Sequence, residues 1–290
     1  MRNIEIGGDW QEAGKTPLER AEHRARKTFT TYKVQMEDFR GISAYADTLP
    51  RDIKKVEERR RLYAEKMSRD PRNAEAHKLS MIFEGLTLDM INNKQTRWFG
   101  ESIEAQKTSE FDDYENAVDL ILTVKDQQRP DRYLTLAIDV TYSVLERDHK
   151  FIEIQEEVSS GRLSRVKYFR ASDGTYGLNN VPRAVVAIDR KTLDELTLLW
   201  SNGNLADLEV HQARFMVLDE LFVQMKAFAE LARAKKHSEA ADQFEHLARV
   251  IEGVLSKFPR RPKREELASD TGYASIIALA EKTHREARLV

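Results

Sequence analysis

The chain has no cysteine, and its 290 residues include only 12 glycines and seven prolines. Without cysteine it forms neither disulfides nor thiolate metal sites, and it has no thiol nucleophile. The glycines do not gather into a phosphate-binding loop ahead of a helix. No stretch approaches the roughly 18 apolar residues of a membrane span, and the N-terminus lacks the apolar run of a secretory signal. We therefore expect a cytoplasmic protein with no membrane partner.

An excess of charge of either sign is also missing. Lysine and arginine number 47 against 49 aspartates and glutamates, which gives a formal net charge of -2. A global positive field therefore does not draw this chain to nucleic acid, and any nucleic-acid site must be a local patch. Charged residues make up 33% and hydrophobic residues 41% of the chain. This composition supports a real core surrounded by many exposed helices.

Hydrophobic periodicity divides the chain into four segments. We expect a flexible N-terminus, a helical N-terminal segment, an α/β core and a C-terminal helical segment that packs on the core. The four segments are 1–16, 17–94, 95–200 and 201–290. The second segment predicts three helices, and Asn73 is the expected N-cap of the third. These helices are expected at about 18–40, 48–69 and 74–93.

The pattern changes within the core segment. After an expected helix, two apolar, β-branched runs are joined by a polar turn that contains proline, which predicts an antiparallel hairpin. A helix, a strand, a loop and a continuously apolar strand follow. The expected bounds are 95–107 for the first helix, 117–124 and 133–142 for the hairpin, 144–159 for the second helix, and 164–171 and 181–189 for the later strands. The predicted fold class is mixed α/β, with a small central sheet between extensive helices.

The C-terminal segment returns to helical spacing. Helices at about 207–235 and 238–256, joined by a short turn, predict an antiparallel pair, and a last helix is expected at about 273–287. The amphipathic pair is the surface that we expect a second copy of the chain or a protein partner to use.

Two aspartates stand out in the predicted hairpin. Asp119 lies in the first apolar run, and Asp139 lies in the second with Thr141 on the same strand face. A carboxylate in an apolar strand is costly to bury unless it is paired or binds a metal. Two neighbouring carboxylates repel each other unless a cation or a shared proton lies between them. Such a pair can hold Mg²⁺, which prefers oxygen ligands. The alternative is that each aspartate pairs with an arginine such as Arg165 or Arg183.

The stretches TSEFDDYENAVDLIL, LTLAIDVTYS and SGRLSRVKYF resemble the core of the PD-(D/E)XK, or restriction-endonuclease-like, superfamily. They are also similar to uncharacterised bacterial proteins with EFDD, NAVD and AIDVT motifs. The superfamily resemblance implies a helix that carries an acid, two strands that carry the metal-binding acids, then a helix and two more strands. It implies a metal-dependent nuclease that acts on DNA or RNA with Mg²⁺ or Mn²⁺. Asp119 and Asp139 match the two strand acids, and the upstream acid is Glu104 or Glu110.

One position departs from the superfamily motif. Thr141 stands where the resemblance implies a catalytic lysine, and a threonine supplies no positive charge. Lys150 on the following helix is the candidate to supply that charge, and its alternative is a solvated surface lysine. The second hypothesis is therefore a catalytically inactive nuclease-fold module that binds nucleic acid or protein. A third is a purely structural protein in which arginines pair with both aspartates.

Basic residues next to the predicted core are candidates for phosphate contacts, which supply much of the affinity for nucleic acid. The candidates are Arg162, Arg165 and Lys167, on or beside the strand expected at 164–171. The alternative is that alternate basic residues on this strand face water.

Overall fold

The computed structural model describes residues 14–125, 133–142, 144–171, 174, 176–258 and 260–289. Within them the fold is mixed α/β, as predicted, with a small four-stranded sheet, a separate two-stranded sheet and helices around both. The first 13 residues and the predicted hairpin turn lie outside the described residues. Among the described helices, none is both long and apolar enough to traverse a lipid bilayer.

Three α-helices form the N-terminal part, as predicted, with two short 3-10 helices (Met36–Phe39 and Ser43–Tyr45) between the first two. Two boundaries differ from the prediction. Helix α1 (Pro17–Tyr32) ends earlier than expected, because the chain turns extended at Lys33 and the Val34 N–H bonds to the Lys107 carbonyl of strand β1. Helix α2 spans Leu49–Arg69 and α3 spans Pro71–Asn92. The N-cap of α3 is Asp70 and not Asn73, because proline at the first helical position starts the helix three residues earlier.

The prediction of a helix at 95–107 is wrong. A turn there leads into strand β1 (Ile103–Lys107), whose residues alternate between buried and exposed. This period of two is a strand pattern. Gly100, with a φ of +83°, lies in the turn before the strand, in a backbone conformation that favours glycine.

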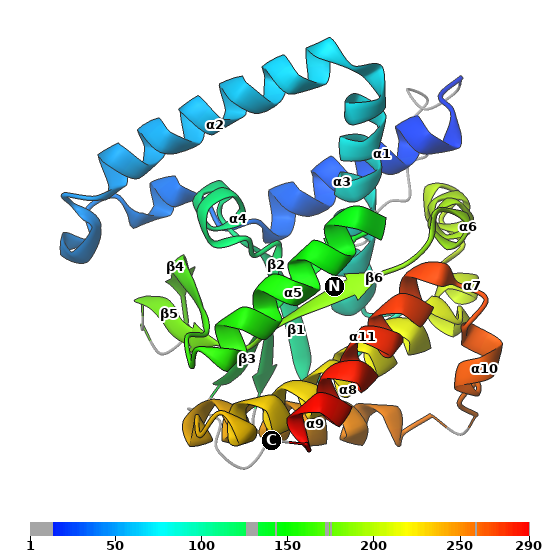
Figure 1. Ribbon diagram of the computed structural model, residues 1–290. Helices are drawn as coiled ribbons and strands as arrows, with labels where there is room; N and C mark the ends of the chain where they lie inside the picture. The colour runs from blue at the N-terminus through cyan, green and yellow to red at the C-terminus, as the bar shows by residue number, and fades with distance from the viewer. Residues whose placement is uncertain are drawn as a thin grey trace.

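The central sheet has the strand order β1-β2-β3-β6. Strand β2 (Leu120–Lys125) pairs antiparallel with β1 and with β3 (Tyr133–Thr141), which confirms the hairpin pairing. Helix α5 (Val144–Ser159) lies on the crossover to β6 (Arg183–Ala187), which runs parallel to β3. In Figure 1, α5 lies across these strands. Strand β6 is buried at every position, as its continuous apolar run predicts.

The strand expected at 164–171 is present as β4 (Ser164–Arg170), but it belongs to the two-stranded sheet. Its partner is β5 (Tyr176–Val181), a strand within a stretch that the sequence predicts as a loop. Most β5 residues are not buried, so hydrophobic alternation does not reveal this strand. Lys167 and the Tyr168 hydroxyl of β4 both contact Asp52 of α2. These contacts anchor the two-stranded sheet to that helix.

The C-terminal part is helical, as predicted. The helix expected at 207–235 is divided by an extended residue, His211, whose ring Nδ1 accepts the Ala213 N–H. The elements are α6 (Arg190–Ser201), α7 (Leu205–Val210), α8 (Ala213–Ala234), α9 (Ser238–Leu255), α10 (Arg264–Leu267) and α11 (Thr271–Ala287). Helices α8, α9 and α11 gather on one side of the strands, and α1 to α3 lie on the other (Figure 1).

Side-chain amides close both edges of the central sheet. At β1, the Asn92 amide pairs with both backbone groups of Ala105, at 2.8 and 2.9 Å. At β6, the Gln224 amide of α8 pairs with both backbone groups of Val185, at 2.7 and 3.0 Å. One helical turn earlier, Glu220 accepts the Ala187 N–H, and burial raises the pKa of this carboxyl well above its ordinary range.

Candidate functional site

The hairpin register brings the two predicted aspartates together. Leu120 of β2 pairs with Ile138 of β3, so Asp119, just before β2, lies opposite Asp139. The Asp119 N–H donates to the Ile138 carbonyl, and its Oδ2 accepts the Val140 N–H at 2.8 Å. Both aspartates are buried, with 7% of Asp119 and 1% of Asp139 exposed. Two carboxylates in such a place need counter-charges or protons.

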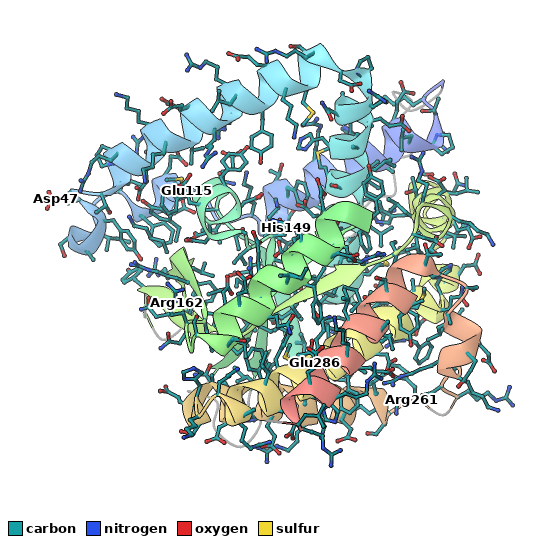
Figure 2. All side chains as sticks on the ribbon, in the orientation of Figure 1. Asp47, Glu115, His149, Arg162, Arg261 and Glu286 are labelled. Carbon is teal, nitrogen blue, oxygen red and sulfur yellow. The ribbon has the colours of Figure 1, made fainter. Side chains whose placement is uncertain are left out.

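Lys150 supplies one counter-charge from the crossover helix α5. Its Nζ lies 3.2 Å from Asp139 Oδ1 and 3.8 Å from Asp119 Oδ2. Burial lowers the pKa of Lys150, but the two aspartates outweigh burial and hold the pKa above its ordinary value. Lys150 is therefore a charged ammonium that touches both carboxylates, and not a solvated surface lysine. Its neighbour His149 is exposed on the outer side of α5 (Figure 2).

Asp139 has a second cationic partner on strand β6. Arg183 Nη1 lies 3.2 Å from Asp139 Oδ2 and donates to the Ala117 carbonyl, while Nη2 lies 2.8 Å from Glu157. The arginine alternative that the sequence left open is therefore present for Asp139, beside Lys150. Burial raises the pKa of Asp139 to about 6, although Lys150 and Arg183 act to lower it.

Asp119 also belongs to a second group of carboxylates. Glu84 of α3, Asp113 of α4 (Glu110–Asn116) and Asp119 each offer one oxygen, and these oxygens lie within 4.8 Å of one another. Lys107 of β1 lies beside them, with Nζ 2.6 Å from Glu84 and 3.1 Å from Asp113. Burial raises the pKa of Glu84 to about 7 and also raises that of Asp113.

The group around Asp139 and the group around Glu84 adjoin at Asp119, and together they contain more acids than bases. The carboxylates of Glu84, Asp113, Asp119, Asp139 and Glu157 contact or adjoin the cations Lys107, Lys150 and Arg183. With every group ionised, the acids exceed the bases by two charges. Bound protons can offset this excess, which agrees with the raised pKa values of three of these acids. A divalent cation can do the same, and carboxylate oxygens are the ligands that Mg²⁺ and Mn²⁺ prefer. The donor set therefore fits the expected metal.

The structure does not bring the two expected upstream acids to this site. Glu104 lies on the exposed face of β1, opposite the face that buries Lys107. Glu110 is 3.1 Å from Lys33 and also bonds to Arg60, and these two cations outweigh burial to lower its pKa. The acid on the helix before the sheet is instead Glu84, within the apolar run IFEGL of α3.

Sequence reasoning missed Glu84 and Asp113. An acid inside an apolar helical run was the signal for Glu84, and Asp113 lies within the quoted EFDD stretch. Thr141, one of the predicted catalytic residues, is buried at the end of β3, two residues beyond Asp139 on the same strand face.

The three predicted phosphate-binding residues are not equally available. Lys167 bonds to Asp52, and its Nζ lies 5.2 Å from the centre of the Phe111 ring. Arg162 and Arg165 are exposed, and Arg162 Nε donates to the Ser160 hydroxyl. Figure 2 shows Arg162 beside the two-stranded sheet. Glu115 of α4 lies below α2 in the same view.

No protein-family model, curated protein or solved structure matches this chain.

Proposed function

We propose that this chain is a metal-dependent phosphodiesterase of the PD-(D/E)XK type that acts on DNA or RNA. One arrangement carries the proposal: Lys150 contacts both strand aspartates, and Asp119 shares its surroundings with Glu84 and Asp113. The order of elements supports it. An acid-bearing helix comes first, then the hairpin β2-β3 with its two aspartates, the helix α5 and the parallel strand β6. Strand β1 and α4 lie between the first helix and the hairpin, and β4 and β5 lie between α5 and β6.

Each residue has a stated role in this proposal. Asp119, Glu84 and Asp113 would hold Mg²⁺ or Mn²⁺, with Asp139 next to them. The bound cation would supply an activated water and positive charge for the phosphoryl oxygens. Lys150 would place a positive charge beside the scissile phosphate. It would replace the catalytic lysine of the superfamily motif, whose position Thr141 occupies in this chain. The backbone N–H of Val140 and the ammonium of Lys150 fix the Asp119 carboxylate in place.

The test is cleavage of labelled DNA and RNA with Mg²⁺ or Mn²⁺, together with Mn²⁺ binding by calorimetry. We expect Asp119→Asn and Lys150→Gln to lower the cleavage rate by about a hundredfold or more, as removal of an electrostatic catalytic group does. Glu153→Gln, a change at a half-exposed side chain on the same helix as Lys150, is the matched control and should cleave like the wild type. The proposal fails if the wild-type chain neither cleaves with metal nor binds Mn²⁺.

A catalytically inactive module is the second candidate function, and one observation favours it. Lys150 contacts one Asp139 oxygen and Arg183 the other, so both oxygens already have cationic partners. In this case the charged groups would stiffen the core, and the chain would bind nucleic acid or protein without cleaving. It predicts no Mn²⁺ binding, no cleavage, and nucleic-acid binding or self-association that Asp119→Asn leaves unchanged. Filter binding and light scattering measure these two properties.

A further inference from the structure

Helix α8 presents a second stripe on the side that faces away from β6. Phe215, Asp219, Phe222 and Lys226 follow one another at spacings of four, three and four residues, so they share one helix face. Glu220 and Gln224, which bond to β6, lie on the opposite face. The stripe of Phe215, Asp219, Phe222 and Lys226 faces α10, α11 and the segment that precedes α10.

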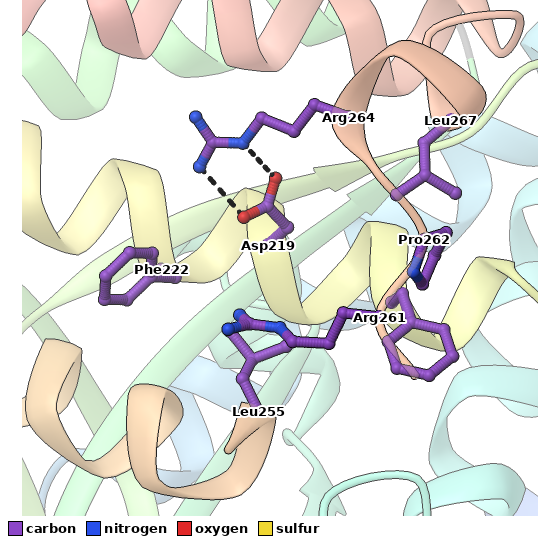
Figure 3. Close-up of a pocket in the computed structure, with 8 residues that line it drawn as sticks. Asp219, Phe222, Leu255, Arg261, Pro262, Arg264 and Leu267 are labelled. Carbon is purple, nitrogen blue, oxygen red and sulfur yellow. Dashed lines mark hydrogen bonds and ion pairs between the residues drawn. The ribbon is translucent and has the colours of Figure 1, made fainter. Parts of the chain in front are cut away.

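Two neighbouring cavities lie along this stripe and share Phe222 and Arg264. The first, of about 280 Å³, is closed by the end of α9 and the segment before α10, and Figure 3 shows its lining. The second, of about 370 Å³, lies between α8 and α11. We call the two together the double cavity. The second cavity alone, at about 370 Å³, is within the volume range of small-molecule sites, which is about 300–1,000 Å³. The apolar side chains along the double cavity are Phe215, Phe222, Val223, Leu255, Leu267 and Ala280.

The charged groups of the double cavity favour an anion. Its two carboxylates, Asp219 and Glu281, both pair with Arg264, at 2.8 and 3.6 Å. Asp219 also accepts the Tyr273 hydroxyl at 2.7 Å. Three further cations line the cavities and form no ion pair with any residue in the described ranges: Lys226, Arg261 and Arg285. Positive charge is thus left over here, although the chain as a whole carries a slight negative excess.

A buried polar atom in the same place also lacks a partner. His284 of α11 lines the second cavity, and its Nδ1 is buried without a hydrogen-bond partner among the described residues. Buried polar atoms are nearly always hydrogen-bonded, so this nitrogen is an unsatisfied polar position in the wall of the second cavity.

We propose that the double cavity binds a small organic anion with a flat apolar body, of the aromatic carboxylate class. The ring would lie against Phe222 and Val223, and the carboxylate would face Lys226 and Arg285. Apolar walls with a few convergent polar groups are the usual make-up of such sites. The inference does not depend on the proposed nuclease activity, because none of its residues belongs to the metal site.

The probe is 2-naphthoate, titrated into the full chain by calorimetry, with 2-naphthalenemethanol as the uncharged probe of similar shape. We expect saturable binding of 2-naphthoate with a Kd below about 1 mM. The double variant Lys226→Gln/Arg285→Gln should weaken it about tenfold or more, since charge-assisted bonds are lost. Both residues are exposed, so the variant should fold, and a urea unfolding curve checks this.

The matched control is Lys235→Gln/Arg249→Gln, which removes the same charge from the exposed C-cap residue of α8 and from an exposed position of α9, neither of which lines the double cavity. It should bind 2-naphthoate like the wild type. The proposal is overturned by no saturable binding at 5 mM probe, by equal binding of the Lys226→Gln/Arg285→Gln variant, or by equally tight binding of the uncharged probe. Loss of binding in the control as well would show attraction by overall charge and would also overturn it.

Discussion

Replacing Lys107 by methionine tests how the buried acids are held. The Lys107 side chain is 6% exposed and bridges Glu84 and Asp113, and methionine keeps most of its apolar stem. Removing one partner of a buried ion pair costs about 3–5 kcal/mol, because the other charge is left unpaired. We expect a loss of unfolding free energy of this size at pH 8, measured by urea denaturation at 25 °C.

The loss should depend on pH in a defined direction. Burial already raises the pKa of Glu84 from 4.5 to about 7, so folding binds protons and wild-type stability falls as pH rises between these values. Without Lys107, the pKa values of Glu84 and Asp113 rise further. The folded variant then keeps both acids protonated to higher pH, and its stability falls more steeply, by up to about 1.4 kcal/mol per pH unit for each acid.

We therefore expect the stability difference between wild type and Lys107→Met to be small at pH 5 and largest at pH 8. The control is Lys78→Met, which breaks a pair with Glu22 whose side chains are 34% and 21% exposed, and it should cost less than about 1 kcal/mol. A difference that stays constant from pH 5 to pH 8, or a variant more stable than wild type at pH 8, would refute the reasoning.

Two further predictions concern packing. Gln224→Leu leaves the N–H and C=O of Val185 unpaired in the core, and we expect urea denaturation to show a loss of about 2–4 kcal/mol; a loss below 1 kcal/mol would contradict this. Gly85→Ala should destabilise the chain by about 1–3 kcal/mol, because the new Cβ would lie 2.7 Å from the Cβ of Ala25 in α1. Gly253→Ala, with nothing within 4 Å, should instead stabilise by about 0.5–1 kcal/mol, so the two alanine variants must shift the urea midpoint in opposite directions.

The hairpin and its aspartates could be predicted because local pattern determines them. Apolar runs indicate β2 and β3, and a hairpin fixes which residues lie opposite each other. Lys150 is a candidate from sequence because it lies on the helix that directly follows the strand of Asp139. The same local pattern also located most helices of the two flanking segments.

Other parts of the site depend on contacts between distant segments. Glu84 reaches Asp119 only because α3 packs on the sheet, and no spacing rule encodes a contact over 35 positions. Strand β1 was mistaken for a helix because its five residues are too few to set a clear period. The two acids expected from the sequence, Glu104 and Glu110, lie nearer to Asp119 along the chain than Glu84 does. Glu104 lies on the exposed face of β1, and Lys33 and Arg60 hold Glu110 away from the site.

The amide-capped edges of the central sheet limit how this molecule can associate. An exposed edge strand offers unpaired backbone groups that can recruit another strand, from a partner peptide or from a misfolded copy. At Ala105 and Val185 those groups are already bonded to Asn92 and Gln224. Strand addition at either position would first have to remove a side chain from the core. Partners should therefore not add a strand to the central sheet at these positions, and that sheet should resist edge-to-edge aggregation.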